Sequence, residues 1–109
     1  MNKAYTLTIG ENTWAIDCPR VTHSGDAEIL SNVYNMFGVV DNTLNITKGQ
    51  EKPDVVNTYI IRFTAGTNCF VNFLGWKLSW VNGESPAEYE SGKIYEITII
   101  DNFAAFIKS

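Results

Sequence analysis

The chain has 109 residues, of which 45% are hydrophobic and 18% are charged, and its formal net charge is −4 at pH 7. This composition excludes an intrinsically disordered protein, and the length fits one domain, residues 1–109. The eight lysine and arginine residues are scattered along the sequence rather than clustered, which argues against nucleic acid as the main partner.

The sequence predicts neither membrane insertion nor secretion. No stretch approaches the ~20 consecutive apolar residues that a membrane-spanning helix needs, and the N-terminal segment lacks the charged start and apolar core of a signal peptide. The two cysteines, Cys18 and Cys69, do not form a metal-binding motif, and their separation leaves open whether they pair. We expect them to be two small buried side chains.

The N-terminal residues alternate between apolar and polar types. In residues 3–9 the apolar positions are two apart, which predicts a half-buried strand. After a turn at residues 10–12, Trp14 and Ile16 continue the apolar face of a second strand. Residues 17–26 are polar and contain proline and glycine, so they are predicted to form a loop.

Residues 27–38 fit two structures equally well. The apolar side chains of this segment recur at helical spacing, and Asp26 is suited to cap a first turn. Ser31-Asn32 interrupts the run and makes a poor helix interior, and residues 33–38 also fit a strand. The pattern alone decides for neither.

The rest of the chain consists of short alternating runs separated by turn dipeptides. Asp41-Asn42 is a hairpin-type turn and Asn82-Gly83 is the strongest short-range turn signal of the sequence. The predicted strands lie at residues 44–47, 58–65, 70–74, 76–80, 95–99 and 103–107. Roughly eight to ten short strands in total predict an all-β fold, an antiparallel sandwich or barrel, and of these we expect a β-sandwich or jelly-roll-like domain.

No constellation of residues that supports catalysis is present in the sequence. His23 is the single histidine and lies in a polar segment, where an exposed loop residue is expected, and no serine stands in a nucleophile-elbow context. One histidine and two distant cysteines do not make a zinc site. The late carboxylates flank turns, where acidic residues keep strand edges soluble; they are Glu84, Glu88, Glu90, Glu96 and Asp101. We therefore expect a protein that is not an enzyme and needs no cofactor.

Aromatic side chains make up 13% of the chain and suggest one kind of ligand site. An exposed tryptophan can stack on a sugar ring. Trp80 shares a strand face with Leu78 and is expected in the core, whereas Trp76 follows Gly75 at a strand start and is a better candidate for exposure. The candidate ligand-binding residues are Trp76, Trp14 and Tyr89.

A second set of residues suggests an interface. Several predicted strands carry large apolar residues on both faces, although a sandwich exposed to water leaves one face polar. The residues opposite the expected core faces are Ile60, Phe70, Ile100 and Phe106. A contact between chains explains this surplus, as does an error in the assumed register or a loop that folds over the outer face.

Three segments built of strand and turn residues occur together in one family. They are Asn32-Val33-Tyr34-Asn35-Met36-Phe37-Gly38 leading to Leu44-Asn45-Ile46-Thr47; Tyr59-Ile60-Ile61-Arg62-Phe63-Thr64-Ala65-Gly66; and Trp80-Val81-Asn82-Gly83-Glu84-Ser85-Pro86 followed by Gly92-Lys93-Ile94-Tyr95-Glu96-Ile97-Thr98-Ile99. In these segments the chain resembles a small β-domain found at the C-terminus of tail-fibre, head-fibre or baseplate-associated proteins of tailed bacteriophages and prophages. Residues 1–31 lie outside the resemblance.

The resemblance implies that residues 33–37 form a strand rather than a helix. It also implies a virion structural protein, made in the cytoplasm of a bacterial host, that acts in assembly or in adhesion to the host surface. The partners it implies are other copies of the chain, with a trimer favoured, other virion proteins, and a glycan of the host cell surface. The family has a Leu-Pro step where this chain has Leu74-Gly75-Trp76, so the loop before Trp80 is expected to differ.

Overall fold

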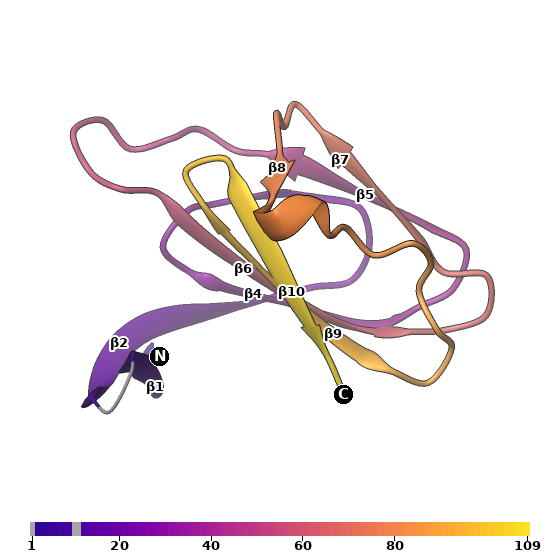
Figure 1. Ribbon diagram of the computed structural model, residues 1–109, viewed down its shortest axis with the longest axis horizontal. Helices are drawn as coiled ribbons and strands as arrows, with labels where there is room; N and C mark the ends of the chain where they lie inside the picture. Colours follow the sequence, from indigo (N-terminus) through magenta and orange to yellow (C-terminus); the bar gives the residue numbers. More distant parts are fainter. Residues whose placement is uncertain (1, 10–11) are drawn as a thin grey trace.

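The computed structural model describes the backbone of residues 2–9 and 12–109, and the side chains from Pro19 onward. In these residues it contains ten strands and one short 3-10 helix (Figure 1). The strands are β1 (Asn2–Ile9), β2 (Asn12–His23), β3 (Ala27–Ile29), β4 (Tyr34–Val40), β5 (Thr43–Lys48), β6 (Thr58–Ala65), β7 (Phe70–Leu74), β8 (Ser79–Trp80), β9 (Ile94–Ile100) and β10 (Phe103–Lys108), and the helix η1 is Val81–Gly83.

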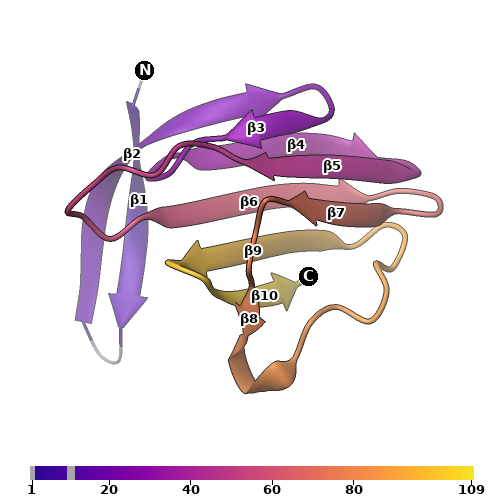
Figure 2. The ribbon, with the colours of Figure 1, turned by 90° about the horizontal axis from the view of Figure 1, so that it is seen from above.

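The strands form two sheets that pack face to face (Figure 2). The larger sheet has the order β1-β2-β4-β6-β9-β10-β8, and the smaller has the order β3-β5-β7. From β2 to β7 the chain alternates between the sheets, so each sheet receives every second strand. This winding makes the β2–β4–β6 and β3–β5–β7 ladders parallel, as in the coils of a β-solenoid.

The all-β, sandwich-like prediction is confirmed, but the expected antiparallel pairing is wrong for most strands. Five pairs are parallel, namely β2–β4, β4–β6, β3–β5, β5–β7 and β8–β10, and three are antiparallel, namely β1–β2, β6–β9 and β9–β10. Asp41-Asn42 is a turn, with Asn42 at φ 62°, yet it joins the two sheets rather than two paired strands. Period-2 alternation reports which face is buried and carries no information on strand direction.

The segment that the pattern left undecided is not helical. Residues 27–29 are β3, residues 34–40 are β4, and Asn32 between them has φ 61°. A residue in the left-handed region ends a helix or a strand, and asparagine adopts it more readily than most residues do. The strand implied by the resemblance for residues 33–37 is therefore confirmed from Tyr34 onward.

The loop predicted for residues 17–26 is wrong in its first part, because β2 continues to His23. The polar composition and Pro19 suggested an end to the strand. Pro19 lies where the ladder with β1 ends, at the Asn2–Pro19 pair, and the ladder with β4 begins, at the Arg20–Tyr34 pair. The N–H that proline lacks therefore falls at the junction of two ladders, where its loss is tolerated.

The core lies between the two sheets. It is built from the inward rows of β4, β5, β6 and β9, and it includes Tyr59, Ile61, Phe63, Tyr95, Ile97 and Ile99, all at most 1% exposed. A long loop between η1 and β9 brings Tyr89 against this core. The β1–β2 hairpin extends from the body at the opposite end of the large sheet from β10 (Figures 1 and 2).

Candidate functional site

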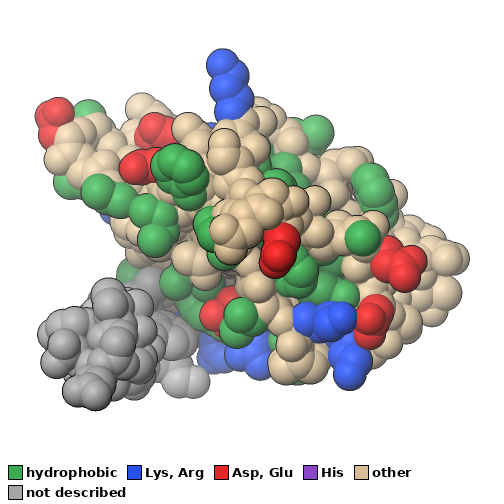
Figure 3. Space-filling model, viewed as in Figure 1, with side chains coloured by type: hydrophobic (Ala, Val, Ile, Leu, Met, Phe, Trp, Pro, Cys, Tyr) green, Lys and Arg blue, Asp and Glu red, His purple; other side chains and the backbone are tan. Residues whose placement is uncertain are grey.

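The outer face of β9 and β10 carries a row of exposed apolar side chains. Phe103 pairs directly with Ile100 across the two strands, and Ile107 lies on the same face of β10. These three residues, here called the outer apolar strip, are 64%, 48% and 68% exposed in that order. Figure 3 looks onto the end of the molecule that carries β10 and η1, where hydrophobic side chains reach the surface between charged ones.

The strip contains one of the four residues predicted as an interface, and a second lies close to it. Ile100 belongs to the strip, and Ile60 lies half-buried on the same outer face one strand away, in β6. Phe70 is 57% exposed but lies on β7 in the other sheet. These three do face outward, as predicted, but they do not form one surface.

Phe106 faces the core, which corrects its predicted outward position. Its ring lies 6.3 Å from that of Trp80 and 6.2 Å from that of Tyr95. Ala104, on the same side of β10, is fully buried opposite Ile99. Residues 103–107 contain large apolar side chains on both faces of the strand, and the register with β9 decides which face is buried. Phe103 and Ile107 were missed for this reason, because no local pattern shows which of the two faces of β10 is buried.

A polar cluster borders the strip on the outer face of the large sheet. The Tyr34 hydroxyl donates to Glu96 Oε2 at 2.6 Å, and Arg62 Nη1 donates to the same hydroxyl at 3.5 Å. Desolvation, helped by Glu96, raises the pKa of Tyr34 above its ordinary value. The hydroxyl therefore stays protonated at neutral pH and fixes the side chains around it rather than acting as a base.

The predicted ligand-binding aromatics take part in packing. The Trp76 Nε1 donates to the Ile46 carbonyl at 3.1 Å, its ring lies edge to face with Tyr59 at 4.8 Å, and the Lys48 ammonium lies 5.6 Å from the ring centroid. Tyr89 packs against both Phe63 and Tyr95, at 5.5 and 5.0 Å between ring centroids, and burial raises its pKa to about 12. The side chain of Trp14 lies outside the described residues. Glycan binding at these positions stays a prediction.

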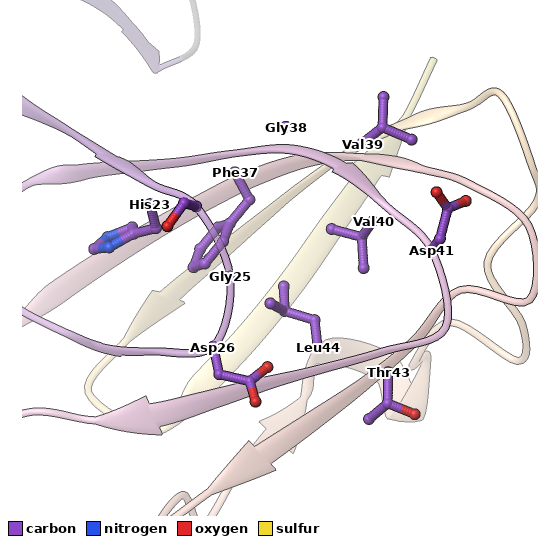
Figure 4. Close-up of a pocket in the computed structure, with 11 residues that line it drawn as sticks. His23, Gly25, Asp26, Phe37, Gly38, Val39, Val40, Asp41, Thr43 and Leu44 are labelled. Carbon is purple, nitrogen blue, oxygen red and sulfur yellow. The ribbon is translucent and has the colours of Figure 1, made fainter.

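A pocket of about 140 Å³ opens between the two sheets on the side of β2 and β3. Figure 4 shows Val40 and Leu44 pointing into the space between β4 and β5, with Asp26 and Asp41 at its margins. Asp26 accepts from the Asn45 N–H and side-chain amide at 2.8 and 3.0 Å, which lowers the pKa of its carboxyl. Asp41 accepts from the Thr67 N–H at 2.7 Å.

The single histidine is fixed by a buried amide beside this pocket. Asn35 is fully buried, and its Nδ2 donates to the carbonyls of Leu30, Val33 and Ile60. Its Oδ1 is therefore the acceptor toward His23 Nε2, 3.0 Å away, which carries the hydrogen. His23 also stacks on Phe37 at 4.8 Å. The half-buried His23 thus closes one side of the pocket rather than standing free in a loop.

The chemistry available in the described residues is limited. They contain no group of three or more histidine, cysteine or acidic side chains placed to hold a metal ion, and no helix among them is long and apolar enough to cross a membrane. Burial raises the pKa of the Cys69 thiol, which keeps it protonated and unreactive.

Comparison with protein families, with curated proteins and with solved structures finds no match for this chain.

Proposed function

We propose that the chain is a non-enzymatic structural domain of a phage virion, in a fibre or tail-associated part, that assembles with copies of itself through the outer apolar strip. The sequence resemblance supports the phage origin, and the strip supports assembly. A trimer is the favoured oligomeric state. Other virion proteins are further partners, bound through exposed apolar surface like that of the strip.

The exposure of the outer apolar strip carries this proposal. Ile100, Phe103 and Ile107 lie together on two paired strands and are about half or more exposed. Fully burying an apolar side chain of this size, relative to leaving it exposed, contributes about 1.5–3 kcal/mol to the free energy of association. Contiguous exposed apolar surface of this kind marks interaction sites in soluble proteins.

The test is the mass in solution, measured by light scattering on a sizing column over a range of concentrations. The wild type is expected as a trimer. The double variant Phe103→Ser, Ile107→Ser is expected to be a folded monomer, because it removes the apolar contact and leaves the core intact.

The control is Val55→Ser, Val56→Ser, which changes two equally exposed apolar residues (56% and 60%) in the loop between β5 and β6. It is expected to leave the trimer unchanged. A wild type that stays monomeric at high concentration, or a strip variant that stays trimeric, would contradict the proposal.

A further inference from the structure

The strands β2 and β3 form a first coil of the winding, and β4 and β5 form the second. The first coil pairs with only about half of the second. The β2–β4 ladder pairs residues 20–23 with residues 34–37, and the β3–β5 ladder pairs residues 27–29 with residues 46–48. Among the described strands, residues 38–40 of β4 and residues 43–45 of β5 therefore have no neighbouring strand on the side of the first coil. Two short open edges face the same side, one in each sheet.

The backbone groups at these edges point outward from the fold. The Val40 carbonyl accepts from Gly66 N at 2.8 Å, on the β6 side. Because consecutive residues of a strand direct their N–H and C=O groups to opposite sides, those of Val39 point toward the open side. The Asn45 N–H points to the same side of β5, where it bonds Asp26, and Thr43, two residues earlier, shares its direction.

The pocket lies between the two open edges (Figure 4). The core residues Phe37, Val40 and Leu44 form a small apolar floor, most of the remaining lining is polar, and the volume of the pocket is about 140 Å³. A cavity of about 150 Å³ accommodates a group of the size of benzene. The pocket therefore has room for one aliphatic side chain, delivered by a strand that lies along an edge.

The margin of the pocket is acidic. Asp26 and Asp41 lie among its lining residues, which include no lysine or arginine. The edge at Gly38 and Val39 carries no lysine or proline, and the register of β4 against β6 shifts between Met36 and Val39. Asp26 and Asp41 favour a ligand with positive charge beside its apolar group.

We propose that this half-open coil binds an extended segment of a partner protein that carries one aliphatic side chain, with basic residues two positions away on the same face of the segment. The segment adds a short strand to the edge of β4 at Val39, places its aliphatic side chain in the pocket and its basic groups near Asp26 and Asp41. Main-chain hydrogen bonds then give affinity, and the pocket gives specificity, as in other cases of strand addition. This site is separate from the outer apolar strip and does not depend on assembly through it.

The test uses the full chain and two synthetic peptides, acetyl-Lys-Thr-Ile-Thr-Lys-amide and its counterpart with glutamate in place of lysine, so that the charged side chains share the face of the isoleucine. Binding is followed by chemical-shift changes of the backbone amides. The lysine peptide is expected to shift residues 37–45, and the glutamate peptide to bind about tenfold more weakly or worse. No saturable shift up to millimolar peptide, or shifts confined to other surfaces, would overturn the proposal.

Val39→Pro removes the N–H that the edge offers, and Val39→Ala keeps it. The proline variant is expected to lose binding and the alanine variant to retain it. If the proline variant does not fold, the same question is answered from the peptide side with two lysine peptides, one N-methylated at its isoleucine and one at the two neighbouring threonines. Because only every second N–H of the segment faces β4, one of the two is expected to lose binding to the wild type. Equal binding of both methylated peptides and the unmethylated peptide would rule out strand addition.

Discussion

The inner and outer faces of the large sheet use the same kinds of residue to different ends. On the inner face Ile61, Ile97 and Ile99 are completely buried against the smaller sheet. On the outer face Ile100, Phe103 and Ile107 are about half or more exposed, in the same or neighbouring strands. Residue type is therefore not what separates core from surface here. The difference is the presence of a second layer on one side only.

This comparison gives each face its own expected response to mutation. Removing an inner side chain leaves a cavity that the packed layers cannot close, whereas removing an outer one exposes no new surface in a single chain. The inner rows should therefore control folding, and the outer rows should control association.

The largest effect is expected from matched phenylalanine truncations on the two faces. Phe63 is 1% exposed and stacks on Tyr95 at 5.6 Å, whereas Phe103 is 64% exposed. Phe63→Ala should lower the free energy of unfolding by about 3–5 kcal/mol, and Phe103→Ala should change it by less than about 0.5 kcal/mol. Urea denaturation of both variants measures this difference.

That experiment is done at a concentration where the wild type is monomeric, since association adds stability of its own. Similar losses in the two variants would mean that the outer face is covered within a single chain. The comparison between the faces would then fail.

A smaller loss is expected from the buried amide of the inner layer. Asn35 is fully buried, with its amide bonded to three carbonyls and to His23. Asn35→Ala should cost about 1–3 kcal/mol, because it leaves buried acceptors without a donor. Asn72→Ala is the control, since Asn72 is half-buried on the outer face of the small sheet, where it donates to Asn45 at 3.1 Å. Unfolding that is insensitive to Asn35→Ala would show that water reaches these carbonyls.

The sequence was enough to predict the strand content because the fold follows local alternation closely. In β6 and β9 every second residue is buried, and period-2 patterns report that directly. The turns at Asn82-Gly83 and Asp101-Asn102 could also be predicted, and Asn82 and Asp101 have positive φ as such turns require. In these parts the local preference and the tertiary structure agree.

What the sequence did not reveal depends on contacts distant in the chain. The parallel winding follows from Asp41-Asn42 joining two sheets, which the dipeptide alone does not distinguish from a hairpin. The buried side of β10 depends on its register with β9, where Ala104 meets Ile99. The pocket exists because β2 and β3 pair with only part of β4 and β5, and no local pattern encodes such a mismatch of lengths.

The smallest effect is expected from a charged pair at the margin of the fold. Lys108 Nζ donates to Glu90 Oε1 at 2.9 Å, and this bond lowers the pKa of the Glu90 carboxyl and raises the pKa of Lys108. A carboxyl with a lowered folded-state pKa stabilises the fold above its unfolded pKa, and that contribution is lost as pH falls through the folded value.

Glu90→Gln should therefore lower the melting temperature slightly at neutral pH, and the difference from the wild type should vanish in acid. The control is Glu84→Gln, which changes an exposed glutamate at the end of η1. It should leave the melting temperature unchanged at neutral pH. Both side chains of the pair are well exposed, so water and salt screen their attraction and the effect should shrink further at high ionic strength. A Glu90→Gln difference that persists unchanged into acid would mean that the side chain acts by packing the 84–93 loop against Tyr95 rather than through its charge.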